Sequence, residues 1–308
     1  MNGAAANAAH LTRRQLVVLV LLTLVWGLNW PVLKYGVSGS PAAPSPYPPL
    51  TFRALSMVLG LPVLALALLW LKVPFAVPRS EWRELARLTL ANMLVWHVVI
   101  VEAVQRLSSG RVAILGYTMP IFAALWGWLR WGERLSWRAL LGVAAAGLGV
   151  ALLLASEFAR MSGAPLAALA VVARAAVWAW GTHMLRRSPS RVPLLALSFW
   201  MTALTTVAIC LLAWLLERDA WREPDALVWG AIAYNAIGAF GFAQPAWFYL
   251  ARGLPPVASS ISVMMIPVLG TYSGAWLLGE ALHWQDYAAM AAIVASIALV
   301  LQRRPSAG

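Results

Sequence analysis

Few side chains in this sequence could do acid–base chemistry, and they stand inside long apolar runs. His97, His183 and Glu102 are the candidates within those runs. The sequence has no Gly-x-Ser-x-Gly or His-Glu-x-x-His motif, and Cys210 is its only cysteine. No cluster of cysteine and histidine suits a metal. So sparse a set predicts that the protein is not an enzyme and holds no metal or cofactor.

His97 and Gln244 form a pair of hydrogen-bonding side chains near the middle of two apolar runs, 147 positions apart (244 − 97). A polar group is costly in hydrocarbon, so it needs a partner or a function. We predict that Gln244, His97 and the neighbouring Trp96 bind the polar end of a small molecule. The alternative is a hydrogen bond between helices, worth about 0.6–2 kcal/mol.

A second group of candidates combines tryptophans with short polar side chains. Two registers align the segments that carry most of them. An offset of 154 places Asn29 over His183, whereas an offset of 152 places Trp26 over Trp178, and both stay open. Aromatic walls suit an apolar or aromatic molecule and bind cations through their faces. Ordinary packing is the alternative for each member of this group: Trp26, Asn29, Tyr117, Trp178, Trp180, His183, Tyr234, Asn235 and Trp247.

Two prolines and one acid could serve movement or coupling. Pro120 and Pro267 each interrupt an apolar run, because proline removes a backbone donor and frees a carbonyl. Each is a candidate hinge, and a static kink is the alternative. Glu102 could exchange a proton within the membrane, although an i,i+4 ion pair with Arg106 would also explain it.

The elements that must position these residues are membrane-spanning helices. Hydrophobic residues make up 62% and charged residues 11% of the chain, with a mean hydropathy of +0.75. Soluble domains carry about 25% charged residues. Apolar runs of about 20 residues recur, and each can cross a bilayer as a helix. We predict an all-α integral membrane protein with ten helices at 14–36, 49–71, 83–105, 111–130, 136–156, 164–186, 192–216, 226–250, 256–278 and 284–302.

The net charge of +12 lies in short clusters between these runs. Anionic lipid headgroups explain such clusters, so we predict a lipid bilayer and no nucleic acid as partner. Placing both termini in the cytoplasm puts the arginines at 130–138, 186–191 and 303–304 inside. The segment 217–225 then lies outside, with four acids and two arginines. This bias predicts a multi-pass protein of the cell inner membrane with both termini cytoplasmic.

One pattern occurs twice in the chain. The stretch WGERLSW at 131–137 returns as LGEALHW at 278–284, which is 147 positions later (278 − 131). The same offset aligns Pro120 with Pro267, and the match runs without a gap from about 102 to 154. A repeat of this length indicates two copies of a five-helix unit.

Five helices per copy is an odd number, so the second copy crosses the bilayer in the opposite sense. The first Gly-Glu loop is flanked by arginines, whereas the second copy has no Lys or Arg between Arg252 and Arg303. An outward-facing loop should lose its positive charge in this way. We therefore predict two inverted five-helix repeats, 1–158 and 159–308, around a central cavity.

The fifth and tenth predicted helices are rich in small residues, which let helix backbones approach closely. We predict that these two helices pack together as a scaffold, away from the cavity. A homodimer face is the alternative, so monomer and homodimer both stay open. The small residues are Gly142, Ala146, Gly149, Ala288, Ala292 and Ser296.

Three features of the chain resemble the EamA family of the drug/metabolite transporter superfamily. They are WGLNWPVLK at 26–34, Arg53 early in the second helix, and the Pro…Gly-Glu stretches at 120–133 and 267–280. The stretch GYTMPIFAALWGWLRWGERL (116–135) and the many tryptophans are also similar to aromatic amino acid exporters of the YddG type. The resemblance implies a ten-helix carrier that exports small metabolites.

By this resemblance, the substrate is most simply an amino acid, including aromatic ones, moved by alternating access. Two alternatives stay open, namely export of cationic drugs or other amphiphilic metabolites, and a facilitative, channel-like pore. The sequence has no Gly-x-x-x-x-Gly-Lys-Ser/Thr loop, so ATP does not drive transport from this chain alone.

Overall fold

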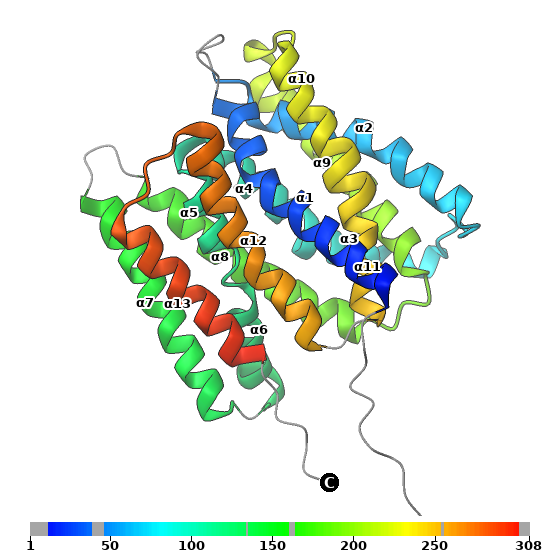
Figure 1. The fold of residues 1–308 in the computed structure, drawn as a ribbon. Coiled ribbons are helices and arrows are strands. Elements are labelled where there is room, and N and C mark those ends of the chain that lie inside the picture. Colours follow the sequence, from blue (N-terminus) through cyan, green and yellow to red (C-terminus); the bar gives the residue numbers. More distant parts are fainter. Residues whose placement is uncertain (1–11, 39–45, 134, 160–163, 254–255, 302–308) are drawn as a thin grey trace, which may run out of the picture.

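The computed structural model describes residues 12–38, 46–133, 135–159, 164–253 and 256–301 (Figure 1). All secondary-structure elements in these residues are helices. The elements are α1 (Arg13–Ser38), α2 (Pro49–Trp70), η1 (Arg79–Glu81), α3 (Trp82–Thr89), η2 (Leu90–Leu94), α4 (Val95–Arg106), α5 (Ser109–Gly116), α6 (Met119–Trp131), α7 (Trp137–Ala159), α8 (Pro165–Arg187), α9 (Leu194–Glu217), η3 (Arg218–Ala220), α10 (Ala226–Ala233), η4 (Tyr234–Ala243), α11 (Gln244–Gly253), α12 (Pro256–Leu278) and α13 (Trp284–Leu301).

These elements form ten membrane spans, as the hydropathy predicts. Eight helical stretches are long and apolar enough to cross a bilayer, and the shorter apolar helices Met264–Leu278 and Trp284–Leu299 complete the set. Several spans consist of more than one element: α3, η2 and α4 form the third, α5 and α6 the fourth, and α10, η4 and α11 the eighth. The prediction of an all-α, ten-helix membrane fold is confirmed.

The outer surface of the bundle is apolar. Leu66, Leu148, Val207 and Trp276 are among many large hydrophobic side chains that are more than half exposed. Such a surface would aggregate in water, but it is the surface that lipid chains require.

Helices from the two halves of the chain lie side by side. In the interior, α1 packs along α12, α2 along α9, and α4 along α8. The largest buried cluster accordingly draws its side chains from both halves, for example Trp30 and Val112 from the first and Ile266 and Ile293 from the second. The protein is therefore one bundle rather than two separate ones.

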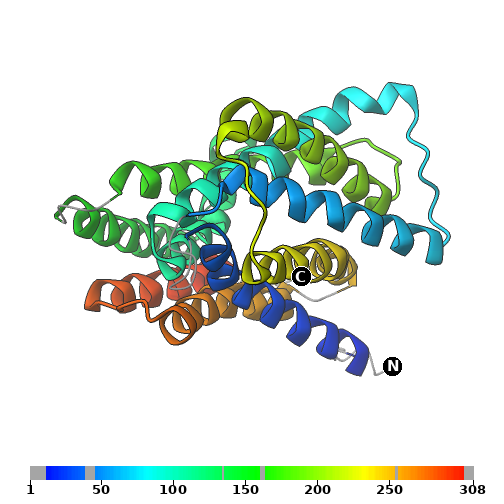
Figure 2. The ribbon, with the colours of Figure 1, turned by 90° about the horizontal axis from the view of Figure 1, so that it is seen from above.

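The predicted pairing of the fifth and tenth helices is confirmed by α7 and α13. The two helices lie side by side at one edge of the bundle in both views (Figures 1 and 2). A Cβ atom on Gly149 would lie 3.3 Å from the carbonyl oxygen of Ala289, so glycine permits the close approach. Ser296 Oγ donates to the carbonyl of Gly142 at 2.5 Å. Small residues thus join these two helices tightly.

The two Gly-Glu loops have the same backbone conformation. Gly132 ends α6 with φ of +66°, and Gly279 follows α12 with φ of +65°. Both values lie in the left-handed region, which glycine adopts at no steric cost. The sequence repeat therefore corresponds to a structural repeat at these loops.

The glutamates of the two loops also fold back in the same way. The backbone N–H of Glu133 donates to the carbonyl of Gly127 at 3.1 Å, and that of Glu280 to the carbonyl of Gly274 at 3.4 Å. Each carboxylate covers its glycine so closely that a Cβ there would lie 2.6 Å from an Oε2 atom. The partners of the two carboxylates differ, as described below.

Candidate functional site

The helical spans near the predicted site residues are irregular. The π-helical segment η2 ends at Leu94, just before His97, and the π-helical segment η4 ends just before Gln244. Pro245 has no N–H and so weakens the regular hydrogen bonding at that point of the eighth span. Segments of this kind are frequently found at functional sites. The sequence analysis did not predict them.

The two candidate hinge prolines lie in different local structures. The fourth span breaks at Tyr117 and Thr118, and Pro120 lies in the first turn of α6. Pro267 instead lies inside the continuous helix α12. A proline in the first turn of a helix costs little stability, whereas a proline in the interior removes a backbone hydrogen bond. The role of both as hinges stays a prediction.

His97 and Gln244 differ in burial and in their polar contacts. His97 is buried, its ring packs 5.3 Å from the ring of Phe240, and its Nδ1 has no hydrogen-bond partner in the described part of the chain. Gln244 is half-buried, and its Nε2 lies 4.0 Å from the sulfur of Met93. The buried, unsatisfied ring nitrogen leaves a polar group of His97 available to a ligand.

Arg174, in the middle of α8, is a functional candidate that the sequence analysis missed. It is 1% exposed, and among the residues that the structure describes none accepts a hydrogen bond from its Nε, Nη1 or Nη2. Its Cζ lies 3.2 Å from the centre of the Trp96 ring, and Trp96 packs 4.5 Å from Trp178. The predicted Trp96 and Trp178 therefore form an aromatic platform for a buried guanidinium.

The break in the fourth span lies beside this guanidinium. A Cβ on Gly116 would lie 3.1 Å from Arg174 Nη2 and 3.6 Å from the ring of Trp30. Trp30 in turn contacts Tyr117 edge to face at 6.4 Å. Within the described ranges the buried Nε1 of Trp30 and Oδ1 of Asn29 have no hydrogen-bond partner. The predicted Tyr117 thus belongs to the aromatic region beside Arg174, and Asn29 precedes Trp30 in α1.

Arg53 is the second buried arginine of the interior. Its Nη1 donates to Asn235 Oδ1 at 3.3 Å, while its Nε has no acceptor among the described residues. Its Cζ lies 5.6 Å from the ring of Phe240, the ring that packs on His97. Both Arg53 and Arg174 lie within electrostatic range of His97. We call Trp96, His97, Arg174, Trp178 and Arg53 the central cluster.

A row of hydroxyl groups on α9 adds to the polar interior. Ser198, Thr202 and Thr205 are buried on one face of the helix, and their hydroxyls have no partner in the part of the chain that is described. Small hydroxyls in apolar sequence are common, so no sequence signal singled them out. The helix α9 that carries them packs against α2 and η2.

Three other predicted residues form a contact group on α1 and the eighth span. Trp26 packs 5.8 Å from Trp247. Tyr234 donates its hydroxyl to the carbonyl of Val25 at 2.8 Å. This bond ties the two spans together and occupies the polar end of the tyrosine.

The predicted Trp180 and His183 lie in a third group near the end of α8. Trp180 and His183 both stack on Trp131, at 5.5 and 4.5 Å. Both ring nitrogens of His183 have partners, namely the carbonyl of Ala123 at 2.8 Å and Arg187 at 2.9 Å. His183 is therefore a satisfied histidine, unlike His97.

Glu102 pairs with Arg106 at 2.8 Å, in the i,i+4 geometry that the sequence analysis gave as the alternative to proton exchange. Both side chains are partly exposed near the end of α4. The role of Glu102 in coupling stays a prediction.

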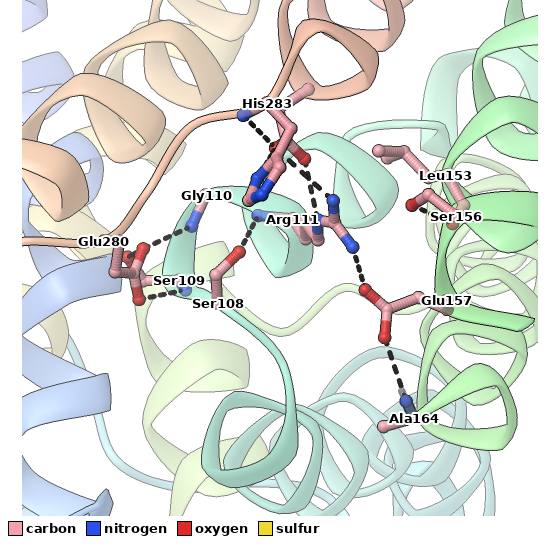
Figure 3. Close-up of polar contacts among 11 residues, drawn as sticks. Ser108, Ser109, Gly110, Arg111, Leu153, Ser156, Glu157, Ala164, Glu280 and His283 are labelled. Atoms are coloured by element: carbon pink, nitrogen blue, oxygen red, sulfur yellow. Dashed lines mark hydrogen bonds and ion pairs between the residues drawn. The ribbon is translucent and has the colours of Figure 1, made fainter. Parts of the chain in front are cut away.

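A separate, fully paired charge cluster lies at the start of α5 (Figure 3). Arg111 bonds to Glu157 and donates from its Nε to Asp286 Oδ1 at 2.7 Å. Glu280 accepts from the backbone N–H of Ser109 at 2.7 Å and from its hydroxyl at 2.8 Å. These bonds join the ends of α5, α7 and α13, and a carboxylate at a helix N-terminus is favourable.

A cavity of about 530 Å³ lies between α2, α9 and the start of the eighth span. Its walls are mostly apolar, with Arg222 as the one charged side chain among the lining residues. The cavity therefore differs in chemistry from the central cluster. It is lined by Tyr47, Thr51, Ala54, Leu55, Val58, Cys210, Ala213, Trp221, Arg222, Pro224 and Trp229.

Known proteins match the chain over most of its length. The model of the EamA-like transporter family matches residues 14–155 and 162–302. An uncharacterized transporter of Bacillus subtilis, YoaV, is 21% identical over 84% of this chain and 86% of its own. The uncharacterized protein PA1977 of Pseudomonas aeruginosa is 31% identical over 83% of this chain and 85% of its own.

A crystal structure of another protein has the same fold. It is 24% identical in sequence, covers 92% of this chain and 96% of its own, and superimposes with a TM-score of 0.63.

Proposed function

The chain belongs to the EamA-like transporter family, and from this premise we propose that it exports amino acids, including aromatic ones, by alternating access. It is a multi-pass membrane transporter rather than an enzyme, with the bilayer and a small-molecule substrate as its partners. We further propose that the membrane is the cell inner membrane, that both termini are cytoplasmic, and that 1–158 and 159–308 are the two repeats.

One observation carries the proposal for the substrate. The central cluster combines hydrogen-bonding groups with tryptophans, and it draws them from α4 in the first half and α8 in the second. An amino acid has charged groups at one end and, when aromatic, a flat apolar body at the other. Charged, polar and aromatic side chains in one buried place match those two ends.

The proposed mechanism requires two conformations that expose this region in turn. Inverted-repeat carriers obtain them by moving one bundle against another around a fixed site. The tightly joined α7 and α13 suit the static part of such a device. The break between α5 and α6, next to Arg174, suits the mobile part.

The test is counterflow of labelled L-phenylalanine in liposomes that contain the purified protein. We expect saturable uptake that stops when unlabelled L-phenylalanine is absent from the lumen. His97→Ala and Gln244→Ala should each lower the initial rate about tenfold, because each removes about one hydrogen bond. Leu148→Ala, on the lipid-facing surface, is the matched control and should transport normally.

The alternatives predict different outcomes of the same assay. Non-saturable flux without counterflow would indicate a channel-like pore. Uptake of a quaternary ammonium dye with no amino acid transport would indicate a carrier of cationic compounds. The two buried arginines of the central cluster argue against the latter, because they repel a cation. Full transport by both His97 and Gln244 variants would remove these residues from the site.

A further inference from the structure

We propose that Arg174 binds the carboxylate of the transported molecule, so that the substrate class is organic acids and zwitterions. This assignment rests on the proposed function, since it names the group that the same site recognises. It starts from the guanidinium that has no acceptor for its Nε, Nη1 or Nη2 among the described residues.

Folding alone gives no reason to keep this charge. Arg174 is 1% exposed, so its guanidinium has lost the hydrogen bonds of water without gaining others from the described chain. Arg111 is comparably buried, at 3% exposed, but is paired with Glu157 and Asp286. Buried charges in proteins are normally paired in this second way. Since no described residue fills that role, we assign the partner of Arg174 to the transported molecule.

The geometry of the guanidinium selects the kind of partner. Trp96 covers one face of the group, with 3.2 Å from the ring centre to Cζ. A ligand must therefore approach the edge of the guanidinium, where the N–H donors form a planar fork. That fork matches the two oxygens of a carboxylate in a bidentate arrangement.

The backbone of Gly116 lies close to one side of the guanidinium. A Cβ on Gly116 would lie 3.1 Å from Nη2, so a larger residue there would crowd the guanidinium. The fourth span breaks directly after Gly116, at Tyr117 and Thr118. Inverted-repeat carriers bind their substrates at such discontinuous helices near the bilayer midplane.

The surrounding charge favours an anionic group and disfavours a cation. Arg53, the other arginine of the central cluster, donates to the neutral amide of Asn235 rather than to an acid. Within the described residues, the buried carboxylates Glu157 and Asp286 both pair with Arg111 instead. A carboxylate on Arg174 would neutralise part of this positive charge.

The test measures binding separately from transport, with three compounds that share one aromatic body. L-Phenylalanine carries a carboxylate and an amine, 3-phenylpropionate only the carboxylate, and 2-phenylethylamine only the amine. Binding to the purified full chain is read as the concentration-dependent rise in its melting temperature. The variants are Arg174→Gln and Arg174→Lys. Arg186→Gln, an exposed arginine on the same helix, is the control.

For Arg174→Gln we expect about 10- to 100-fold weaker binding of both carboxylates, which is the value of a charge-assisted pair. Arg174→Lys keeps the positive charge but not the planar fork of N–H donors, so its affinity for the carboxylates should fall less than that of Arg174→Gln. Arg186→Gln should bind like the wild type. Without ligand, Arg174→Gln should melt at the wild-type temperature or higher, because it removes an unsatisfied buried charge.

Three results would overturn the assignment. The first is equal binding of the carboxylates to the wild type and to Arg174→Gln. The second is the absence of carboxylate binding to the wild type. The third is a large loss of stability in both Arg174 variants without ligand, since that would indicate a structural partner.

Counterflow of the same compounds separates this assignment from the proposed function. Arg174-dependent binding without counterflow would contradict the transport of amino acids and leave the carboxylate site standing. Counterflow of L-phenylalanine at the wild-type rate in Arg174→Gln would contradict the carboxylate site and leave the transport function standing.

Discussion

Two regions of this bundle bury an arginine, and they treat its charge in opposite ways. At the start of α5, Arg111 lies between two carboxylates, and those bonds fix the ends of three helices. In the interior, Arg174 has only the face of Trp96 and no acceptor from the described residues. Burial alone therefore does not reveal what a charge is for. The presence or absence of a partner separates a structural arginine from one that can bind a ligand.

Substitution of Arg111 should have the largest effect. Arg111→Met leaves Glu157 and Asp286 buried without their cation, which typically costs about 3–5 kcal/mol of stability. The measurement is the unfolding transition of the purified protein in detergent. The triple variant with Glu157→Gln and Asp286→Asn should recover much of the loss, because no buried charge is left unpaired. An Arg111→Met protein as stable as the wild type would show that Arg111 is not a structural arginine, and the contrast with Arg174 would fail.

The same substitution at Arg174 should act in the opposite direction. Arg174→Met replaces an unpaired buried charge with an apolar side chain of similar length, so stability should stay the same or rise by about 1–4 kcal/mol. Counterflow of L-phenylalanine should be lost at the same time. The measurement is the pair of melting temperature and initial rate. A strongly destabilised variant would place Arg174 in the structural class with Arg111.

Glu280→Gln should have the third-largest effect. The carboxylate accepts two short hydrogen bonds from Ser109, and bonds to charged groups are worth about 1.5–3 kcal/mol. The variant should melt lower, and hydrogen exchange should be faster at the start of α5 than elsewhere. Unchanged exchange there would show that the charge of Glu280 does not hold this helix end.

Glu133→Gln is the matched change in the other Gly-Glu loop, and its effect should be the smallest. Glu133 is 46% exposed and pairs with Arg187 at 3.2 Å, and such surface pairs are worth about 0–1 kcal/mol. Its melting temperature should stay near that of the wild type, and 1 M salt should remove any difference. A fall in melting temperature as large as that of Glu280→Gln would show that the two glutamates stabilise their loops equally.

Much of the fold could be predicted from the sequence because membrane spans need long apolar runs. The predicted spans and the helical elements agree to within a few residues at most ends. The fourth span begins earlier than predicted, at Ser109, since Ser108 caps it by accepting from the N–H of Arg111. The offset of 147 also identified the two loops that share a left-handed glycine.

The irregular parts of the helices could not be predicted in the same way. Pro120 and Pro267 are equivalent in sequence, yet only the span with Pro120 is broken. One missing hydrogen bond can be absorbed or can end a helix, and tertiary packing decides which. The π-helical segment η2 likewise has no proline beside it, so local sequence gives no sign of it.

The candidate site was predicted in part. His97, Trp96 and Trp178 stood out because polar and aromatic groups interrupt apolar sequence, and the structure brings them together. Arg174 carried a signal of the same kind, a lone charge in AVVARAAVW, but the sequence analysis did not single it out. Its meaning depended on finding no acid beside it among the described residues, which only the fold reveals.

One residue makes the start of the fourth span different from the start of the ninth. At the start of the fourth span, the backbone N–H of Ser109 donates a hydrogen bond to Glu280, whereas Glu133, the counterpart of Glu280, follows the end of that span. The counterpart of Ser109 in the second repeat is Pro256 (109 + 147), which has no amide hydrogen to offer. The hydrogen bond between the Ser109 N–H and Glu280 at one membrane face therefore cannot be repeated by Pro256 at the opposite face. Under the alternating access proposed above, we expect the closed states at the two faces to differ in stability.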